Sequence, residues 1–442
     1  MKNDTIYAPS SAIGGAIAVI RISGEDAKKT MTLFHRDLSN QPQKLLRVLI
    51  LDGEEIIDDS MAVWFPAPHT YTGEPMVEIN CHGGFQTVQK IMGLLSAKLG
   101  FRPAEGGEFT KRAFLNDKMD LTQAEAVMDI ITADADQSRK AAMLQLQGSV
   151  KKAVEEMENL LMDALSGIDA AIDYPDEAEA DTIESLPQSL FAAIETAEKM
   201  IAQGRRGRVL RDGLRVAILG RPNVGKSSLM NALLGTDRAI VTANAGTTRD
   251  ILDEKISFDG VPVRLIDTAG IRKTSDEAEQ IGVNRAREAM ETADVICVVL
   301  DGSEKLQAED MELLQQTKQD QRRIVLINKN DLTDSCLINA ADIPSDAVVV
   351  SAKTGDGLET LQQRILSMAA PEQLDCTCIT NERHLHLLEQ AMQDMKAAVV
   401  AAELDCKATD LRNALHHLGG ITGTDVDAKV IDRIFQRFCV GK

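Results

Sequence analysis

Residues 216–228 read Val-Ala-Ile-Leu-Gly-Arg-Pro-Asn-Val-Gly-Lys-Ser-Ser. The first four residues are typical of a buried strand, and the apolar residues after the stretch are typical of a helix. Between them, Gly220, Gly225 and Lys226 have the spacing of a phosphate-binding loop. In such a loop, backbone N–H groups and a helix N-terminus surround the phosphates, and the hydroxyl of Ser227 can reach Mg²⁺. The stretch therefore predicts a nucleotide site.

Composition limits the class of protein. The chain has 442 residues, enough for two or three domains, and a formal net charge of −20. This acidity argues against free-standing nucleic-acid binding, so any RNA contact is expected to be local or supplied by a basic partner. No apolar run approaches the ~20 residues of a membrane helix, and no signal-peptide pattern opens the chain, so no membrane partner is expected. Seven scattered cysteines indicate reduced thiols and a cytoplasmic location.

The sequence pattern changes three times along the chain and so divides it into four segments. Residues 1–118 mix strand-like runs with turns, which predicts an α+β domain. Residues 119–210 are helical in pattern, and 211–370 alternate strands and helices as in a mostly parallel sheet. Residues 371–442 are again helix-rich. The simplest architecture is multidomain, with the α/β module inserted into one all-helical domain built from both flanks.

Local patterns predict individual elements. Strands are expected at 17–22, 61–65 and 76–81, and a helix at 85–99. Gly419 and Gly420 are expected to stop a helix. One long helix face is predicted to contain Val150, Val154, Met157, Leu161, Leu165, Ile168 and Ile172. The last helix is predicted to carry Val430, Ile434 and Phe438 on one face.

Four further motifs follow the phosphate-binding loop in the order typical of a GTPase. The carboxylate of Asn328-Lys329-Asn330-Asp331 can accept two hydrogen bonds from the guanine edge, which adenine lacks. Ser351-Ala352-Lys353 closes the next strand and would back the base. Asp267-Thr268-Ala269-Gly270 would place a carboxylate near Mg²⁺ and an N–H near the γ-phosphate. Ala245 to Asp250 offers threonines to the metal. Because all five occur in order, we expect GTP as the nucleotide.

The complete set of residues predicted to bind GTP is Asn223, Val224, Gly225, Lys226, Ser227, Ser228, Thr242, Ala243, Asn244, Ala245, Gly246, Thr247, Thr248, Asp267, Thr268, Ala269, Gly270, Asn328, Lys329, Asp331, Ser351, Ala352 and Lys353.

Two positions depart from Ras-like GTPases. Ile271 stands where those proteins carry the glutamine that orients the attacking water. Glu279, just downstream, is either a replacement for it or an acidic first turn of the helix expected near Ile281. Asn223 is either a neutral loop residue or, with the segment Thr242 to Thr247, a ligand for a monovalent cation beside the phosphates.

The whole chain resembles the tRNA-modification GTPases of the MnmE/TrmE family. The residues that carry the resemblance are Gly246-Thr247-Thr248-Arg249-Asp250, Arg112-Ala113-Phe114-Leu115-Asn116-Asp117-Lys118 and the terminal Phe438-Cys439-Val440-Gly441-Lys442. The resemblance implies a GTPase domain inserted into a helical domain, and an N-terminal domain that dimerises and binds a tetrahydrofolate derivative, either 5-formyl- or 5,10-methylene-tetrahydrofolate.

The resemblance also implies an activity. GTP hydrolysis, dependent on Mg²⁺ and activated by K⁺, would drive addition of a carboxymethylaminomethyl or aminomethyl group to C5 of the wobble uridine of certain tRNAs. The implied partners are a second copy of the chain, tRNA and a FAD/NADH-dependent subunit of the MnmG/GidA type. The alternative is a ribosome-assembly GTPase of the Era/Der type. Such proteins usually carry a basic RNA-binding face or a Gly-x-x-Gly loop, and this acidic chain shows neither clearly.

Individual roles follow from the family pattern. Glu279 falls on the catalytic glutamate, which favours the catalytic interpretation, and Cys439 is either catalytic or a buried thiol at a helix end. Magnesium positions are matched by Ser227 and Thr248, and potassium positions by Asn223, Thr242, Asn244 and Thr247. Folate-contacting positions are matched by Arg21, Glu78, Lys118 and Lys442. Cationic side chains suit an anionic ligand, although the two lysines could also be ordinary surface charges.

Overall fold

The computed structural model describes residues 4–174, 180–236, 253–267, 289–332, 338, 343–369 and 379–441. The chain divides into two compact units. The first combines residues 1–128 with 419–442, and the second comprises residues 129–418. This division is coarser than the four segments expected from the sequence, whose borders stay predictions.

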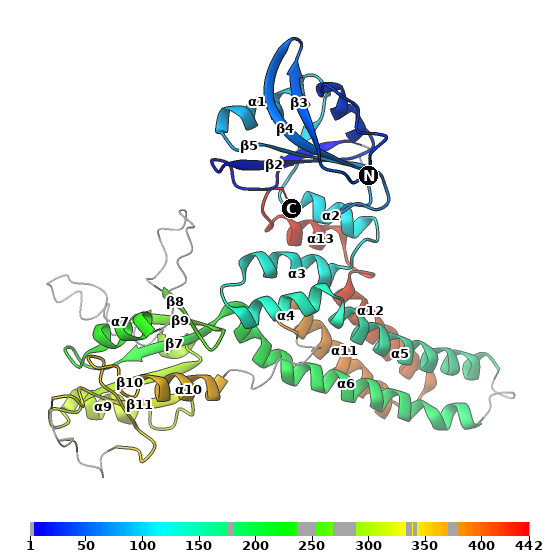
Figure 1. The fold of residues 1–442 in the computed structure, drawn as a ribbon. Coiled ribbons are helices and arrows are strands. Elements are labelled where there is room, and N and C mark those ends of the chain that lie inside the picture. Colours follow the sequence, from blue (N-terminus) through cyan, green and yellow to red (C-terminus); the bar gives the residue numbers. More distant parts are fainter. Residues whose placement is uncertain are drawn as a thin grey trace. The chain divides into compact units, whose positions relative to one another are not determined.

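A six-stranded sheet forms the centre of the first unit (Figure 1). Its strands are β1 (Ile6–Pro9), β2 (Ile17–Ser23), β3 (Leu46–Asp52), β4 (Glu55–Phe65), β5 (Met76–His82) and β6 (Arg102–Pro103). Their order in space is β3-β4-β5-β2-β1-β6, and all neighbours are antiparallel except β1 and β6. The strands predicted at 17–22, 61–65 and 76–81 are confirmed as parts of β2, β4 and β5.

One face of this sheet is covered by apolar side chains. Ala18, Ile20 and Ile22 share a face because side chains alternate along a strand, and all three are buried. They join one core with Val88 and Ile91 of helix α1. The helical elements that lie wholly within this unit are the 3-10 helix η1 (Ala27–Leu33), α1 (Phe85–Ala97), α2 (Glu108–Leu115) and α13 (Ala428–Phe435). The helix predicted at 85–99 is confirmed except for its last two residues.

The face that the last helix buries agrees only in part with the predicted one. Val430 is 44% exposed, whereas Ile431 and Phe435 are buried. Helix α13 ends at Phe435, so Phe438 reaches the same cluster from the turn that follows. The prediction is confirmed for Ile434 and Phe438, which both pack in this cluster, and it was wrong for Val430. It also continued the helix three residues past its end at Phe435.

Long helices make up the remainder of the polypeptide outside the second sheet. They are α3 (Leu121–Thr132), α4 (Asp136–Leu146), α5 (Ser149–Asp173), α6 (Ala180–Asp212), α11 (Glu382–Val400) and α12 (Leu404–Thr422), with α6 packed against α5 and α11. The predicted face of α5 is confirmed at the five buried positions Val150, Val154, Met157, Leu161 and Ile168. Leu165 is half-buried and Ile172 is exposed.

Helix α12 continues through the two glycines that were expected to end it. Gly419 and Gly420 lie inside the helix, which ends at Thr422. A Cβ on Gly419 would come within 2.9 Å of the Thr424 hydroxyl oxygen. The small residue therefore allows the returning chain to pack against the helix, and this contact explains the glycine without a helix stop.

A second six-stranded sheet carries those predicted nucleotide motifs that lie within the described residues. Its strands are β7 (Leu214–Leu219), β8 (Asp253–Phe258), β9 (Val261–Asp267), β10 (Val295–Asp301), β11 (Arg323–Asn328) and β12 (Val348–Val349). The spatial order is β12-β11-β10-β7-β9-β8, and only β8 is antiparallel to its neighbour. Its described helices are α7 (Lys226–Thr236), α9 (Ala308–Gln316) and α10 (Leu358–Ala369). The mostly parallel sheet expected from the sequence is confirmed.

Helix α6 leads almost directly into β7. Only Gly213 separates them, with a positive φ of +82° that favours glycine. The β8–β9 turn contacts the start of α4, where Gln137 Nε2 donates to the carbonyl oxygen of Asp259 at 2.8 Å. Lys255 of β8 also pairs with Asp134 at 2.6 Å. In the part of the chain that the structure describes, no helix is long and apolar enough to cross a membrane.

Candidate nucleotide-binding site

The phosphate-binding loop lies at the carboxyl end of β7, directly before α7. Gly220 and Gly225 have φ of +153° and +97°. A Cβ on Gly220 would come within 2.5 Å of the Val299 carbonyl oxygen, and one on Gly225 would collide with the side-chain amide of Asn328. Glycine is therefore required at both positions by close approach as well as by backbone conformation.

Lys226 is the first residue of α7 and its side chain folds back over the loop. Its Nζ donates to the carbonyl oxygens of Gly220 at 2.7 Å and Arg221 at 2.9 Å. The residue is only 9% exposed. The ammonium group is thus held at the loop, where it can exchange carbonyl partners for phosphate oxygens.

Asn328 joins three loops through one buried side chain. Its Nδ2 donates to the carbonyl oxygen of Val224 at 2.8 Å, and its Oδ1 accepts from the backbone N–H of Ala352 at 3.0 Å. Asn328 is 1% exposed, so these bonds are shielded from water. The amide therefore fixes the spacing between the phosphate-binding loop and the loop expected to back the base. Sequence reasoning did not predict this bridging role.

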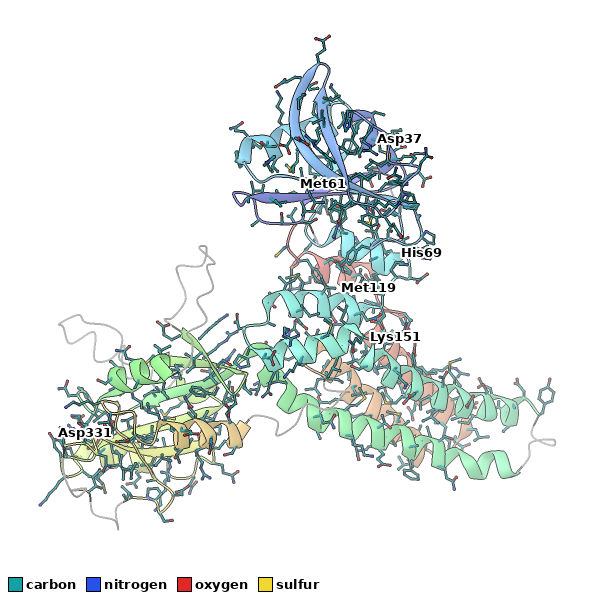
Figure 2. The ribbon with its side chains drawn as sticks, in the orientation of Figure 1. Asp37, Met61, His69, Met119, Lys151 and Asp331 are labelled. Atoms are coloured by element: carbon teal, nitrogen blue, oxygen red, sulfur yellow. The ribbon has the colours of Figure 1, made fainter. Side chains whose placement is uncertain are left out.

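The predicted guanine-binding carboxylate is held in place by its neighbours. Asp331, labelled in Figure 2, accepts a hydrogen bond from Ser351 Oγ at 2.7 Å. Lys353 Nζ lies 3.8 Å from its other oxygen. Both contacts restrict the carboxylate to one orientation, which suits recognition of a flat N–H edge.

Lys329 is paired with an aspartate that sequence reasoning missed. Its Nζ contacts Asp301 Oδ2 at 2.6 Å. Burial acts to raise the pKa of Asp301, but hydrogen bonds from Lys329 and Ser303 outweigh it and hold the pKa below its usual value. Asp301 ends the buried strand β10 in register with Asn328, and that position was the available sequence signal.

Several predicted site residues lie outside the described residues. They are Thr242, Ala243, Asn244, Ala245, Gly246, Thr247, Thr248, Thr268, Ala269, Gly270, Glu279 and Lys442. Asp267 is the last residue of β9 and pairs in register with Ile218 of β7. The motif that begins at Asp267 therefore starts beside the strand that leads into the phosphate-binding loop. Ser227 and Ser228 are exposed in the first turn of α7.

Two predicted folate positions meet directly in the first unit. Arg21 of β2 and Glu78 of β5 are cross-strand neighbours, and Arg21 Nε donates to Glu78 Oε1 at 2.8 Å. The guanidinium group also lies 5.1 Å from the ring centre of Tyr71 and 5.8 Å from that of Phe109. These contacts hold the guanidinium group of Arg21 in one place.

The other predicted folate positions lie in loops. Lys118 is exposed and its Nζ donates to the Pro68 carbonyl oxygen at 3.0 Å. The C-terminal segment runs beside Pro9, because a Cβ on Gly441 would collide with the Pro9 carbonyl oxygen. The residue before Pro9 pairs with Arg21 across β1 and β2. Cys439 is exposed, so its interpretation as a buried thiol was wrong.

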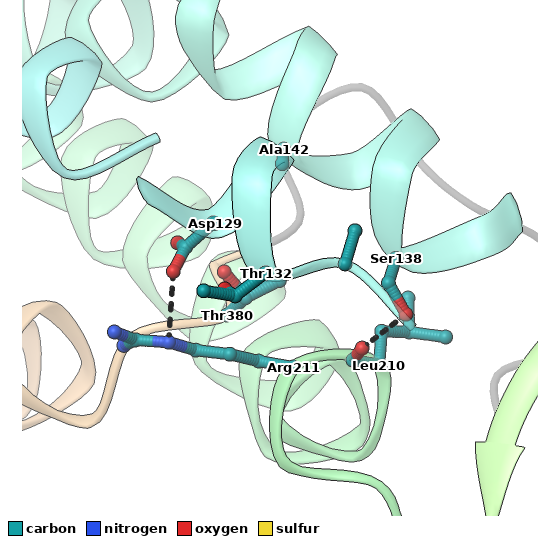
Figure 3. Close-up of a pocket in the computed structure, with 8 residues that line it drawn as sticks. Asp129, Thr132, Ser138, Ala142, Leu210, Arg211 and Thr380 are labelled. Carbon is teal, nitrogen blue, oxygen red and sulfur yellow. Dashed lines mark hydrogen bonds and ion pairs between the residues drawn. The ribbon is translucent and has the colours of Figure 1, made fainter. Parts of the chain in front are cut away.

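A small polar pocket lies where the end of α3 and the start of α4 meet the end of α6 (Figure 3). Arg211 Nε contacts Asp129 Oδ1 at 3.1 Å across it, and Ser138 Oγ donates to the Leu210 carbonyl oxygen. No residue predicted from the sequence lines this pocket. Its ion pair and hydrogen bond instead fasten the end of α6, from which β7 begins.

Two family models together match nearly the whole chain. Residues 121–439 match the family described as MnmE helical domain, and residues 5–118 match the family described as GTP-binding protein TrmE N-terminus. A crystal structure of a variant of Aquifex aeolicus Era bound to GDP·AlF4⁻ is similar at 28% identity and a TM-score of 0.28, covering 43% of this chain and 68% of that one.

Two curated proteins match over nearly their full length. The tRNA modification GTPase MnmE of Clostridioides difficile (strain 630) is 40% identical, covering 100% of this chain and 99% of its own. The tRNA modification GTPase MnmE of Lactiplantibacillus plantarum is 42% identical, covering 99% of this chain and 98% of its own. The chain therefore belongs to the MnmE family of tRNA modification GTPases.

Proposed function

We propose that this GTPase binds guanine through Asp331 and the phosphates through Lys226 and the backbone amides of its loop. The observation that carries the proposal is the buried amide of Asn328, which bonds to the phosphate-binding loop and to the base-side loop at 2.8 and 3.0 Å. One short side chain therefore sets the distance between the two ends of the nucleotide site.

Two cations are proposed to bind to oxygen donors of the phosphate-binding loop and of residues 242–248, which lie outside the described residues. Ser227 and Thr248 are the proposed Mg²⁺ ligands, and Asn223, Thr242, Asn244 and Thr247 are the proposed K⁺ ligands. Among the described members, Ser227 and Asn223 are exposed, and Asn223 adopts a φ of +66° within the loop. Hard cations prefer such oxygen donors. When bound, they would supply positive charge that offsets the charge on the transferring phosphoryl group.

Glu279 is the proposed group that orients the attacking water. Replacing it with alanine is expected to lower kcat by about 10²–10³-fold, because the water would lose its hydrogen-bond acceptor. GTP affinity should stay at the wild-type level, since the carboxylate is not proposed to contact the nucleotide. Single-turnover hydrolysis and fluorescent-nucleotide binding measure the two quantities. Hydrolysis at the wild-type rate would remove Glu279 from the mechanism.

The proposed K⁺ site predicts a choice between alkali cations. Replacing K⁺ by Na⁺ at constant ionic strength is expected to slow turnover at least about tenfold, because the smaller ion fits the same oxygens poorly. Steady-state GTPase assays in KCl and NaCl test this, with Asn223→Ala as the matched variant that should abolish the difference. Equal wild-type rates in the two salts would contradict the cation site.

A tetrahydrofolate derivative is proposed to bind in the first unit, at Arg21, Glu78, Lys118 and Lys442. Arg21 is only 16% exposed at its side chain and stacks near two rings, which fits recognition of a flat or anionic ligand. The ligand would supply a one-carbon unit, either from 5-formyl- or 5,10-methylene-tetrahydrofolate. Exposure of Cys439 fits a role of its thiol at the same end of the chain, which we retain as a proposal.

The wider reaction is proposed from the family. The chain would form a homodimer through residues 1–118 and work with a FAD/NADH-dependent MnmG-type subunit in the cytoplasm. GTP hydrolysis would drive addition of a carboxymethylaminomethyl or aminomethyl group to C5 of the wobble uridine of certain tRNAs. The strongly acidic chain, at −20, supports a partner that supplies much of the basic RNA-binding surface.

Nucleoside analysis of tRNA tests this proposal. A strain that lacks the gene is expected to lose the C5 modification of the wobble uridine, and the wild-type gene should restore it. Ribosome assembly in that strain is the second readout, and it is expected to be normal. Normal wobble uridines together with accumulated ribosomal precursors would support the alternative, an Era/Der-type assembly GTPase.

A further inference from the structure

One side chain of the phosphate-binding loop pairs with carboxylates of another chain segment. Arg221 is 11% exposed at its side chain and makes two ion pairs. Its guanidinium contacts Glu304 at 2.7 Å and Asp310 at 3.1 Å. Both partners belong to the segment that opens helix α9, roughly eighty to ninety residues away in the sequence. The nucleotide motifs do not account for this arginine.

Asp310 makes this contact difficult to break. The residue is 2% exposed, and its Oδ2 accepts from Arg221 and from the backbone N–H of Gln307 at 3.0 Å. Its Oδ1 is buried and has no hydrogen-bond partner among the described residues. A buried carboxylate without its cation is strongly unfavourable. Arg221 is the cationic side chain that pairs with Asp310, in addition to the capping-box hydrogen bond from Gln307, and the ion pair joins the two chain segments.

The same residue takes part in the shape of the loop through its backbone. The Arg221 carbonyl oxygen accepts a hydrogen bond from Lys226 at 2.9 Å. Three residues later, the Val224 carbonyl oxygen is held by Asn328. Pro222 and Asn223 thus lie between two fixed points, and Asn223 has a φ of +66°, in the left-handed region that asparagine adopts more readily than most non-glycine residues. A loop kept in an uncommon conformation needs such external supports.

We propose that Arg221 is a positioning residue for GTP hydrolysis, which holds the phosphate-binding loop in its binding shape by pairing with Asp310 and Glu304 of the α9 segment. It does not contact the nucleotide. Its effect reaches the phosphates through the backbone of residues 221–225 and through Lys226. The inference concerns GTP hydrolysis itself and does not depend on the folate, potassium or partner proposals.

Substitutions in the full-length protein test the role. Arg221→Met removes the charge at similar side-chain length. It is expected to weaken GDP binding about tenfold and to lower kcat/KM for GTP by about 10²-fold. The reason is that displaced loop atoms would lose contacts both with the bound nucleotide and with the transition state of hydrolysis. Asp310→Asn should produce the same pattern. The double variant should be no worse than either single one, because both act through one contact. Fluorescent-GDP titration and steady-state GTPase kinetics are the measurements.

A structural control separates positioning from general stability. Arg322 also pairs with an aspartate, Asp320 at 2.7 Å, and donates to the Met290 and Ala293 carbonyl oxygens, at the opposite end of the parallel strands. Arg322→Met is expected to lower the Tm while leaving the GDP Kd within about twofold of wild type, since residues without shared partners act independently.

Three results would overturn the proposal. The first is wild-type GDP affinity in Arg221→Met. The second is a loss in Arg221→Met that is reproduced neither by Asp310→Asn nor by Asp310→Asn combined with Glu304→Gln, which would mean that the arginine acts directly on the nucleotide. If Arg221→Met fails to fold, Arg221→Lys tests the proposal in its place. Lysine keeps a positive charge beside Asp310 but cannot reach both carboxylates. The lysine variant is expected to fold and to bind GDP about threefold more weakly; wild-type affinity is the third contrary result.

Discussion

Asp331→Asn is expected to weaken GTP binding by about 10³–10⁴-fold, because the guanine N–H groups would face an amide that can accept only one of their two hydrogen bonds. The remaining amide N–H would point at a guanine donor, which adds an unpaired polar contact to the lost one. Ser351 Oγ holds the residue in place, so the substituted side chain cannot easily turn away.

The same geometry predicts that a different base restores nucleotide binding to Asp331→Asn. Xanthine carries a carbonyl oxygen where guanine has its amino group, so the substituted amide could donate to it. Xanthosine triphosphate should therefore be hydrolysed by Asp331→Asn better than GTP is. Competition assays with both nucleotides give the measurement, and Asp346→Asn is the matched control because Asp346 is an exposed residue paired with Arg364 at 3.1 Å. Unchanged GTP preference would contradict the assignment of Asp331.

Lys226→Met is expected to lower kcat/KM for GTP by about 10⁴-fold, because a buried positive charge is lost from both the bound phosphates and the transition state. Lys226 is 9% exposed, and in this structure its ammonium group is satisfied by the Gly220 and Arg221 carbonyl oxygens. Methionine fills the space but leaves both carbonyl groups without their donor, so the shape of the loop should also suffer.

Two measurements distinguish these contributions. GDP affinity reports the loss of ground-state binding, and single-turnover hydrolysis at saturating GTP reports the loss specific to the transition state. The control is Lys318→Met, since Lys318 is exposed in the turn after α9. If Lys226→Met hydrolysed GTP within about tenfold of the wild-type rate, the backbone amides alone would be sufficient to bind the phosphates. That result would contradict the expected contribution of the lysine charge.

Local sequence patterns were sufficient to predict the fold of the part that carries the phosphate-binding loop. The glycine spacing around Lys226 and the strand-like run before it predicted a strand–loop–helix unit, which the structure contains as β7 and α7. Alternation of apolar runs with helical stretches predicted the mostly parallel sheet. These inferences succeeded because backbone sterics and side-chain periodicity act over a few residues, within the range that a sequence displays directly.

Helix limits were less well predicted, for a tertiary reason. Gly419 and Gly420 have the composition of a helix end, but the chain from Thr424 packs closely against Gly419 and the helix continues to Thr422. In α13, the buried residues are Ile431 and Phe435 rather than Val430. The residues that pack against a helix determine which of its faces is buried. The apolar period of the sequence alone leaves the rotation of the helix about its axis uncertain by about one residue.

By itself, the sequence determined that this protein has a phosphate-binding loop and the motif order of its GTPase family, and it predicted a carboxylate that recognises guanine, because each of these patterns lies in neighbouring residues. Only the tertiary structure decided what supports that site. The pairing of Arg221 with Asp310, and of Asn328 with Val224 and Ala352, joins segments far apart in the chain. Ion-pair and hydrogen-bond partners so far apart in the chain leave no periodic pattern or fixed spacing in the sequence. They are determined by which ends of strands and helices the folded chain brings together.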